Sequence, residues 1–435
     1  MSIMDVVLKE IDSRRDDIVK LVQELIRYKT VNPPGDTVEI AGFMKDYLSD
    51  CGLSVNLYES QKGKVSVVGT LKGRGKRRFI WDGHVDVVPV SNPEAWIADP
   101  WEGKVVDSRI IGRGAADMKG NVGAAMVAAS VLAERDLGLM GDLVLALVPD
   151  EETGGYLGSG FLVDKGVLKG DACIVGEFSP FNTLCVGEKG ILWLSVKARG
   201  IPAHASVKFL GVNAIDLLCQ FCFELYKIEQ VDRVLPEEVN RIIDAIQPTL
   251  KQLEALGFPR ELINKMYKRL SVNVGVIRGG EKVNIVPANA EAEVDIRILP
   301  GMDYDQVKEE INKIRMIFNR LLEKTYPNLK SAGIEGITVE ETLRFEPSYQ
   351  KLDAPLVPLV KNVIKKVTGR DPLLFVHTGG TDARFFRAKG IPTVCYGAGS
   401  ETPHGTNEYV PIESLVEATK VYALAAVDIL GTTWP

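Results

Sequence analysis

The chain has 435 residues, of which 46% are hydrophobic and 25% charged, a composition typical of folded proteins that excludes extended disorder. Because this length exceeds that of one ordinary domain, we expect two domains. The net charge of −6, from 52 basic and 58 acidic side chains, gives no basic face for binding a nucleic acid.

No segment has the pattern of a membrane anchor or a signal peptide. The most apolar stretch, 121–132, is too short to span a bilayer. The first residues, MSIMDVVLKEIDSRRDD, place acidic side chains where a signal peptide has a basic start and an apolar core. Six cysteines are too few for a disulfide framework in a chain of this length. We therefore expect a cytoplasmic protein that binds neither membranes nor nucleic acids.

Apolar periodicity predicts that the first part of the chain alternates between helices and strands. Helical spacing predicts helices over 5–28 and 38–51, separated by the Asn-Pro-Pro-Gly stop at 32–35. Further elements follow in order: a strand at 79–81, a helix at 121–134, and strands at 143–148 and 172–175. Because these strands are apolar on both faces, they indicate an α/β fold with a mostly parallel sheet covered by helices.

From about residue 188 the strands alternate between apolar and polar side chains, which indicates a different kind of domain. Strands are predicted at 191–198, 271–277, 291–298 and 336–343, and helices at 212–228, 236–268 and 304–324. The first pattern then returns with a helix at 356–367, a strand at 393–396 and a helix at 412–430. We therefore expect an α/β domain over 1–187 and 348–435, interrupted by an inserted α+β domain over 188–347.

Five segments of the α/β domain are rich in side chains that bind metals. They are DGHVD at 82–86, GAADMKG at 114–120, DEETG at 150–154, GE at 176–177 and TPHG at 402–405. Most follow predicted strands, whose carboxyl ends meet at one edge of an open α/β sheet. Carboxylates gathered there repel one another unless cations neutralise them, and histidines with carboxylates suit Zn²⁺ or a similar ion.

These side chains are sufficient for two metal ions. With His84, His404 and three carboxylates, each ion can have one histidine, one carboxylate of its own and one shared carboxylate. Asp117 is suited to be the shared ligand, because two carboxylate oxygens can hold ions about 3.5–4 Å apart.

Two further acids have roles beside the metals. Asp86 lies two residues after His84 on an extended segment, so it can accept the proton of the ring nitrogen that does not face the metal. Glu151 and Glu152 are adjacent and cannot both point at one ion from a single turn. One would therefore be a ligand, and the other would be left as the general base of a hydrolase.

In this order, the motifs resemble those of the M20 metallopeptidases, which include acetylornithine deacetylase, succinyl-diaminopimelate desuccinylase, aminoacylase-1 and carboxypeptidase G2. The matching segments are HVDVVP, GRGAADMKG, DEETGG, the GE at 176–177, GIPAHAS, NIVPANAEAEVDIR, HTGGTDARFF and GAGSETPHGTNEYV. The resemblance implies a hydrolase of linear amides with two zinc ions per subunit, which Co²⁺ or Mn²⁺ can replace. It also implies that the inserted domain is a lid that forms a homodimer.

The resemblance assigns a role to each residue of the metal site. Five residues would hold the two ions: His84, Asp117 and Glu177 one ion, and Asp117, Glu152 and His404 the other. Glu151 would be the base that moves the proton, and Asp86 would orient His84. A cis peptide bond after Asp117 is also implied.

Three residues of the inserted domain match positions that contact substrate in the family. By resemblance, His204 in GIPAHAS stabilises an oxyanion, often from the partner subunit, and Asn284 in NIVP makes a weaker polar contact. Arg297 in VDIR binds a substrate carboxylate, for which the planar guanidinium group is well suited. Residues 230–270 form a charged helical insertion beyond the compact family pattern, so whether His204 acts across a dimer stays open.

Three other motifs are less specific. The segment Gly379–Phe385 matches a loop that lines the substrate pocket in the family. His377 is expected to be a histidine of the pocket wall or the core. Cys219 and Cys222 have the spacing of half a zinc site, but they lie on an apolar helix and are expected to pack as small hydrophobic residues.

The sequence thus predicts an enzyme that cleaves the amide of a small N-acyl amino acid, as a deacetylase or desuccinylase does, with a dizinc-activated water and Glu151 as general base. A metallo-carboxypeptidase or dipeptidase acting on a short peptide is the alternative, since only the pocket differs. A non-catalytic metal-binding scaffold is a more distant alternative, because such a protein is expected to lose a ligand or the base.

Overall fold

The computed structural model describes residues 2–135, 137–179, 182–400 and 402–433. The chain divides into two compact units. The first contains Met1–Val186, Gln350–Phe375 and Thr381–Pro435, and the second contains Gly187–Tyr349 and Val376–Gly380. The short segment Val376–Gly380, which sequence patterns group with the α/β domain, therefore belongs to the second unit.

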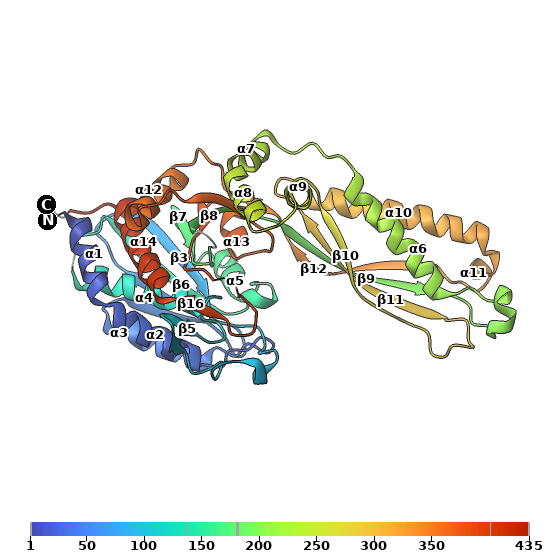
Figure 1. Ribbon diagram of the computed structural model, residues 1–435, viewed down its shortest axis with the longest axis horizontal. Helices are drawn as coiled ribbons and strands as arrows, with labels where there is room; N and C mark the ends of the chain where they lie inside the picture. The colour runs from blue at the N-terminus through green and yellow to red at the C-terminus, as the bar shows by residue number, and fades with distance from the viewer. Residues whose placement is uncertain (1, 136, 180–181, 401, 434–435) are drawn as a thin grey trace. The chain divides into compact units, whose positions relative to one another are not determined.

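A nine-stranded mixed sheet forms the centre of the α/β fold (Figure 1), in the order β1-β2-β6-β3-β7-β15-β8-β13, with β14 paired to β8. The middle strands β6, β3, β7 and β15 are parallel, and the outer pairs are antiparallel. The strands are β1 Ser54–Gln61, β2 Lys64–Leu71, β3 Arg77–His84, β6 Gly141–Val148, β7 Ala172–Val175, β8 Thr183–Glu188, β13 Ser348–Tyr349, β14 Leu373–His377 and β15 Thr393–Cys395. The predicted parallel α/β sheet is confirmed at its centre, and antiparallel strands extend it on both sides.

Helices cover both faces of this sheet. Val144, Ala146 and Val148 of β6 share a hydrophobic core with Leu162 of α5 and Phe386 of α13. Because side chains alternate along a strand, the intervening residues of β6 face the other side, where α4 and α14 pack. The helices are α1 Ile3–Ser13, α2 Arg15–Arg27, α3 Val38–Asp50, α4 Lys119–Glu134, α5 Ser159–Asp164, α12 Leu356–Thr368, α13 Ala383–Ala388 and α14 Ile412–Leu430. The single helix predicted over 5–28 is therefore two helices, which meet at Arg14.

A small antiparallel sheet connects two distant parts of the first unit. Its strands are β4 Lys104–Val106, β5 Arg109–Ile111 and β16 Tyr409–Pro411, in the order β16-β5-β4. Tyr409 pairs with Ile111, and Pro411 pairs with Arg109. The pairing holds the segment that leads into Asp117 beside the segment that follows His404.

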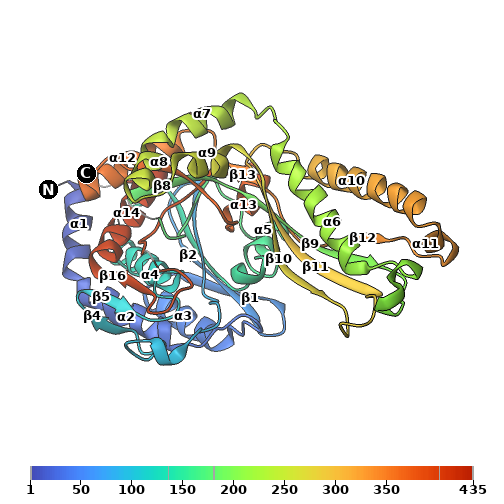
Figure 2. The ribbon, with the colours of Figure 1, turned by 45° about the vertical axis from the view of Figure 1, so that its right-hand side comes forward.

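The second unit has a four-stranded antiparallel sheet with the order β10-β11-β9-β12. Its strands are β9 Gly190–Arg199, β10 Ser271–Gly279, β11 Asn289–Ile298 and β12 Ile337–Phe345. Helices α6 Ala214–Tyr226 and α10 Tyr304–Thr325 cover one face (Figure 2), where Leu192, Leu194 and Val196 of β9 join their core. The alternate residues of β9 therefore lie on the opposite face of the sheet.

The insertion predicted as helical over 230–270 forms three short helices. They are α7 Glu237–Ala245, α8 Gln247–Ala255 and α9 Arg260–Lys268. Pro236 caps α7, Pro248 lies in the first turn of α8, and Pro259 caps α9, so a proline marks each of the three helix starts. None of the helices in the described part of the chain has both the length and the apolar character needed to cross a membrane.

Candidate metal centre

The carboxyl ends of the parallel strands bring the predicted metal-site residues of the first unit together. His84 is the last residue of β3, and Glu177 comes two residues after the end of β7. Glu151 and Glu152 start a 3₁₀ turn after β6, where Asp150 has a positive φ of 83°. This sharp reversal directs the two adjacent glutamates back over the end of the sheet.

Asp117 lies between the two predicted histidine ligands. Its Oδ1 is 3.0 Å from His84 Nε2, and its Oδ2 is 3.1 Å from His404 Nε2. Glu177 Oε1 is 3.6 Å from His84 Nε2, and Glu152 Oε2 is 3.2 Å from His404 Nε2. Each histidine thus has one carboxylate of its own and shares Asp117 with the other histidine.

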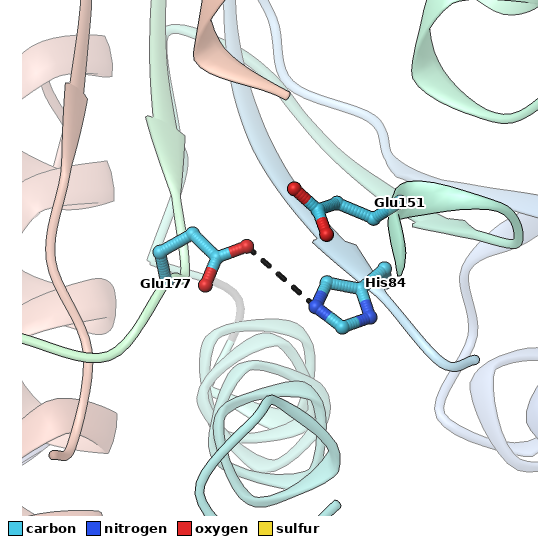
Figure 3. A group of neighbouring side chains, drawn as sticks. All are labelled: His84, Glu151 and Glu177. Carbon is cyan, nitrogen blue, oxygen red and sulfur yellow. Dashed lines mark ion pairs between the residues drawn. The ribbon is translucent and has the colours of Figure 1, made fainter. Parts of the chain in front are cut away.

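These distances fit the donors of a divalent metal ion. Two atoms that each bind a tetrahedral zinc at about 2.0–2.2 Å lie roughly 3.3–3.6 Å apart. The side chains of His84, Glu151 and Glu177 point toward a common centre (Figure 3), and so do those of His84, Asp117 and Glu152. Glu152 Oε1 is buried and has no hydrogen-bond partner among the described residues, and a cation would satisfy such an oxygen.

The electrostatics of the cluster also favour a cation. Burial and the neighbouring Glu177 raise the pKa of the Glu151 carboxyl well above its usual value. Burial and Asp117 do the same for the pKa of Glu177. Hydrogen bonds to Asp117 and Glu152 raise the pKa of His404 to about 11. The ionised carboxylates are therefore stabilised by a positive charge beside them. A divalent ion carries two positive charges, whereas an imidazolium carries one.

Asp86 acts mainly on the loop of the two glutamates. His84 Nδ1 donates to the main-chain oxygen of Asp86 at 3.0 Å, whereas the Asp86 carboxylate is 3.5 Å away. The carboxylate instead accepts hydrogen bonds from Asn32 Nδ2 (2.8 Å) and from the main-chain N–H groups of Glu151 (3.2 Å) and Glu152 (3.3 Å). The main chain of Asp86 thus orients the imidazole, and its side chain holds the glutamates in place.

Glu408 is a residue of the site that sequence reasoning missed. It is fully buried, forms an ion pair with Arg113 at 2.6 Å, and accepts from the main-chain N–H groups of Ala116 (2.9 Å) and Asp117 (3.0 Å). Arg113 Nη2 also donates to the main-chain oxygen of His404 at 3.2 Å. The pair therefore joins the loops that carry Asp117 and His404. The peptide bond between Asp117 and Met118, just before α4, is cis, as the resemblance implies.

The GGTDARF segment, which is expected to line the substrate pocket, also supports the turn of the two glutamates. Arg384 is buried and donates to the main-chain oxygens of Thr381 (2.6 Å) and Gly154 (2.5 Å). Gly154 follows the turn of Glu151 and Glu152. Arg384 therefore supports the glutamate turn from within the protein.

The predicted substrate contacts lie in the second unit. The main-chain N–H of Ala205 donates to the Asn284 carbonyl at 3.0 Å, so His204 and Asn284 lie on neighbouring segments. The main-chain N–H of Ser206 donates a hydrogen bond to His204 Nδ1 at 3.2 Å. Arg297 on β11 forms an ion pair with Asp295 at 2.8 Å.

The remaining histidine and the cysteine pair have ordinary structural settings. His377 is half-buried and accepts at Nδ1 from the main-chain N–H of Gly379 at 3.1 Å. Cys219 and Cys222 are free thiols on α6, and Cys222 belongs to the hydrophobic core of the second unit.

Comparison with known proteins places this geometry in a family. Residues 80–428 match peptidase family M20/M25/M40. An uncharacterized metallohydrolase of Methanocaldococcus jannaschii is 30% identical over 429 residues, covering 94% of this chain and 98% of that protein. The N-formyl-4-amino-5-aminomethyl-2-methylpyrimidine deformylase of Bacillus subtilis is 27% identical over 438 residues, with 95% and 94% coverage.

A solved structure shows the same fold. The M20 family metallo-carboxypeptidase Sso-CP2 from Sulfolobus solfataricus superimposes with a TM-score of 0.77 at 23% identity, covering 95% of this chain and 98% of that one. Since the family match spans most of the chain and includes each segment of the metal centre, the chain belongs to peptidase family M20/M25/M40 and is a metal-dependent hydrolase of amides.

Proposed function

We propose that this chain is a zinc-dependent deacylase that hydrolyses the amide bond of an N-acyl amino acid. The observation that carries the proposal is the position of Asp117, with one carboxylate oxygen facing each of the two histidines. A relative that removes a formyl group supports acyl removal as the reaction.

The residues present would hold two metal ions. His84, Asp117 and Glu177 would bind one ion, and Asp117, Glu152 and His404 would bind the other. When bound, such ions polarise the scissile carbonyl and make water more acidic, and Co²⁺ or Mn²⁺ can replace Zn²⁺ in this role.

Glu151 is the proposed general base. Its side chain points into the group formed with His84 and Glu177 (Figure 3), while the hydrogen bond from its main-chain N–H to Asp86 fixes its backbone. A carboxylate held in this way takes a proton from the attacking water and delivers it to the departing amine.

The second unit would supply the substrate contacts. Arg297 binds the substrate carboxylate, His204 stabilises the oxyanion and Asn284 adds a polar contact. We also propose a homodimer formed through this unit. Phe223 on α6 and Ile317 and Leu321 on α10 expose large apolar side chains, which supports an interface there.

A substrate panel tests the proposed function. Hydrolysis would be followed for N-acetyl, N-succinyl and N-formyl amino acids, an N-formylated aminomethylpyrimidine and dipeptides, each with Zn²⁺, Co²⁺ or Mn²⁺. Turnover of N-acyl amino acids is the expected result. Turnover of dipeptides alone would favour the peptidase alternative, and a metal-loaded protein that is inert toward the whole panel would favour the scaffold alternative.

Metal removal is expected to abolish activity and lower the melting temperature. The buried carboxylates lose their counter-charge, and a ligand present at a thousand times its Kd contributes about 4 kcal/mol to stability. Activity, calorimetric melting and metal content would be measured before chelation, after it and after zinc is added back.

We expect Asp117→Asn to weaken both sites, whereas Glu94→Gln, at an exposed position outside the cluster, is the matched control. Two firmly bound ions in Asp117→Asn would contradict the shared-ligand role.

A further inference from the structure

The interior of the first unit contains a buried lysine beside the turn of the two glutamates. Lys64 is the first residue of β2, is 6% exposed, and belongs to none of the five metal-binding segments. Its ammonium group lies 3.4 Å from Asp150 Oδ1 and donates a hydrogen bond to Asn32 Oδ1 at 3.2 Å. Lysines are seldom buried unless they are paired, and these two contacts account for a charge inside the protein.

Lys64 decides which way the amide of Asn32 points. An ammonium group only donates hydrogen bonds, so the amide must turn its oxygen toward Lys64 and its Nδ2 away from it. Nδ2 then donates to Asp86 Oδ2 and to Thr153 Oγ1, each at 2.8 Å. In the reversed orientation the amide oxygen would face the Asp86 carboxylate, and two acceptors would be in contact without a proton between them.

The Asp86 carboxylate connects this amide to the glutamates. It accepts hydrogen bonds from the main-chain N–H groups of Glu151 at 3.2 Å and Glu152 at 3.3 Å. Asn32 and Asp86 are both buried, and hydrogen bonds are stronger away from water. A continuous series of hydrogen bonds therefore leads from Lys64 to the main chain of the glutamate turn.

Asp150, the ion-pair partner of Lys64, starts the same turn. Its Oδ1 accepts from Thr153 Oγ1 at 2.9 Å, and its Oδ2 accepts from the main-chain N–H of Leu157 at 3.0 Å. The positive φ of Asp150 is uncommon for a residue other than glycine and persists only where the surroundings hold it. The ion pair with Lys64 and the two hydrogen bonds are such surroundings.

The contact between Lys64 and Asn32 is closely packed. A Cβ atom at Gly35 would lie 2.5 Å from Lys64 Nζ and 2.7 Å from Asn32 Cγ, so the main chain of Gly35 packs directly against both side chains. Gly35 also has a φ of 65°, a conformation that glycine adopts readily and other residues rarely do. Neither side chain therefore has room to change its position.

We propose that Lys64 is a positioning residue for Glu151. It fixes the amide of Asn32, the amide orients Asp86, and Asp86 holds the main chain of both glutamates. This inference rests on the proposed function, in which Glu151 is the general base. Catalytic groups must be held close to the geometry of the reaction, because a displacement of about 1 Å can lower the rate by about 100-fold.

Lys64→Met tests this role, since methionine fills the site but neither donates a hydrogen bond nor carries a charge. At saturating zinc, we expect kcat to fall by about 10- to 100-fold and KM to change little. Hydrogen exchange of the amides of 151–157 should become about 10-fold faster, while exchange in β6 stays the same. Lys72→Met is the matched control, because Lys72 is an exposed lysine that pairs with Asp142 at 2.8 Å, and it should change neither quantity.

The double variant Lys64→Met/Asp150→Asn separates positioning from charge burial. It removes both charges of the ion pair, so its melting temperature should return toward that of the wild type. The amide of Asn32 still lacks the donor that orients it, so kcat should stay low. Recovery of kcat together with the melting temperature would show that Lys64 only balances Asp150, and it would overturn the inference. Should Lys64→Met fail to fold, the double variant serves for the same measurements.

Hydrogen exchange distinguishes failure of this inference from failure of the proposed function. If the wild type hydrolyses no substrate of the panel, the deacylase proposal fails, and exchange of the 151–157 amides then decides the role of Lys64. Faster exchange that is confined to this turn supports the inference. Unchanged exchange in the turn, or faster exchange throughout the first unit, refutes it. With an active wild type, an unchanged kcat in Lys64→Met refutes it as well.

Discussion

Glu151→Gln is expected to lower kcat by about 10²- to 10⁴-fold, the usual contribution of general acid–base catalysis, while both metal ions stay bound. The amide has the shape of the carboxylate but cannot take a proton from water. Because the change affects a step after substrate binding, we expect kcat to fall and KM to change little. Steady-state kinetics and elemental analysis of the same sample would measure the two effects.

The neighbouring residue provides a matched control. Glu152 Oε2 faces His404 at 3.2 Å, so Glu152→Gln is expected to lose metal together with activity. Activity of Glu151→Gln near that of the wild type would refute its assignment as the base. Loss of metal from Glu151→Gln but not from Glu152→Gln would reverse the roles of the two glutamates.

The convergence of the metal-site residues was predictable because it depends on strand ends. His84 and Glu177 lie at the carboxyl ends of β3 and β7, so their apolar strands already place them at one edge of the sheet. A long distance from Asp117 to either histidine would have contradicted a shared ligand. Its two carboxylate oxygens instead lie 3.0 Å from His84 Nε2 and 3.1 Å from His404 Nε2. The same reasoning predicted β6 and α4, because each is a nearly continuous apolar run that is buried on all sides.

Contacts made to the main chain could not be predicted in this way. Glu408 accepts three hydrogen bonds from the N–H groups of Gly114, Ala116 and Asp117, and every non-proline residue has such a group. Nothing in the side chains of that loop indicates the partner. The carboxylate of Asp86 lies 3.5 Å from His84 Nδ1, and the nearer contact through the main-chain oxygen of Asp86 could not be predicted for the same reason.

Element boundaries were missed where the chain changes direction without an obvious signal. The break between α1 and α2 falls at Arg14, where the helical spacing of Ile11 and Ile18 continues on both sides. The antiparallel hairpin of β1 and β2 turns at Lys62 and Gly63, and Gly63 adopts a φ of 83°. This hairpin could have been predicted from the sequence, because a glycine between two β-prone runs is typical of a hairpin turn.

Removing the Glu408 carboxylate is expected to destabilise the fold and to loosen the metal centre together. In Glu408→Ala, the buried Arg113 loses its counter-charge, and the three N–H groups of the Asp117 loop lose their acceptor. Breaking a buried ion pair on one side costs about 3–5 kcal/mol. Asp117 and the main chain of His404 are also released, so metal affinity should fall. Urea unfolding of the metal-free protein and a zinc titration would measure the two effects.

The double variant Arg113→Met/Glu408→Gln separates charge burial from positioning. It removes both charges and leaves an amide oxygen as acceptor, so its loss of stability should be smaller than that of Glu408→Ala. The zinc affinity of the double variant should exceed that of Glu408→Ala to the extent that the amide oxygen still accepts hydrogen bonds from the Asp117 loop. The exposed ion pair of Arg278 and Glu293 is a suitable control, since Glu293→Ala is expected to cost less than about 1 kcal/mol. A Glu408→Ala protein as stable as this control, with unchanged zinc affinity, would show that the Asp117 loop keeps its position without Glu408.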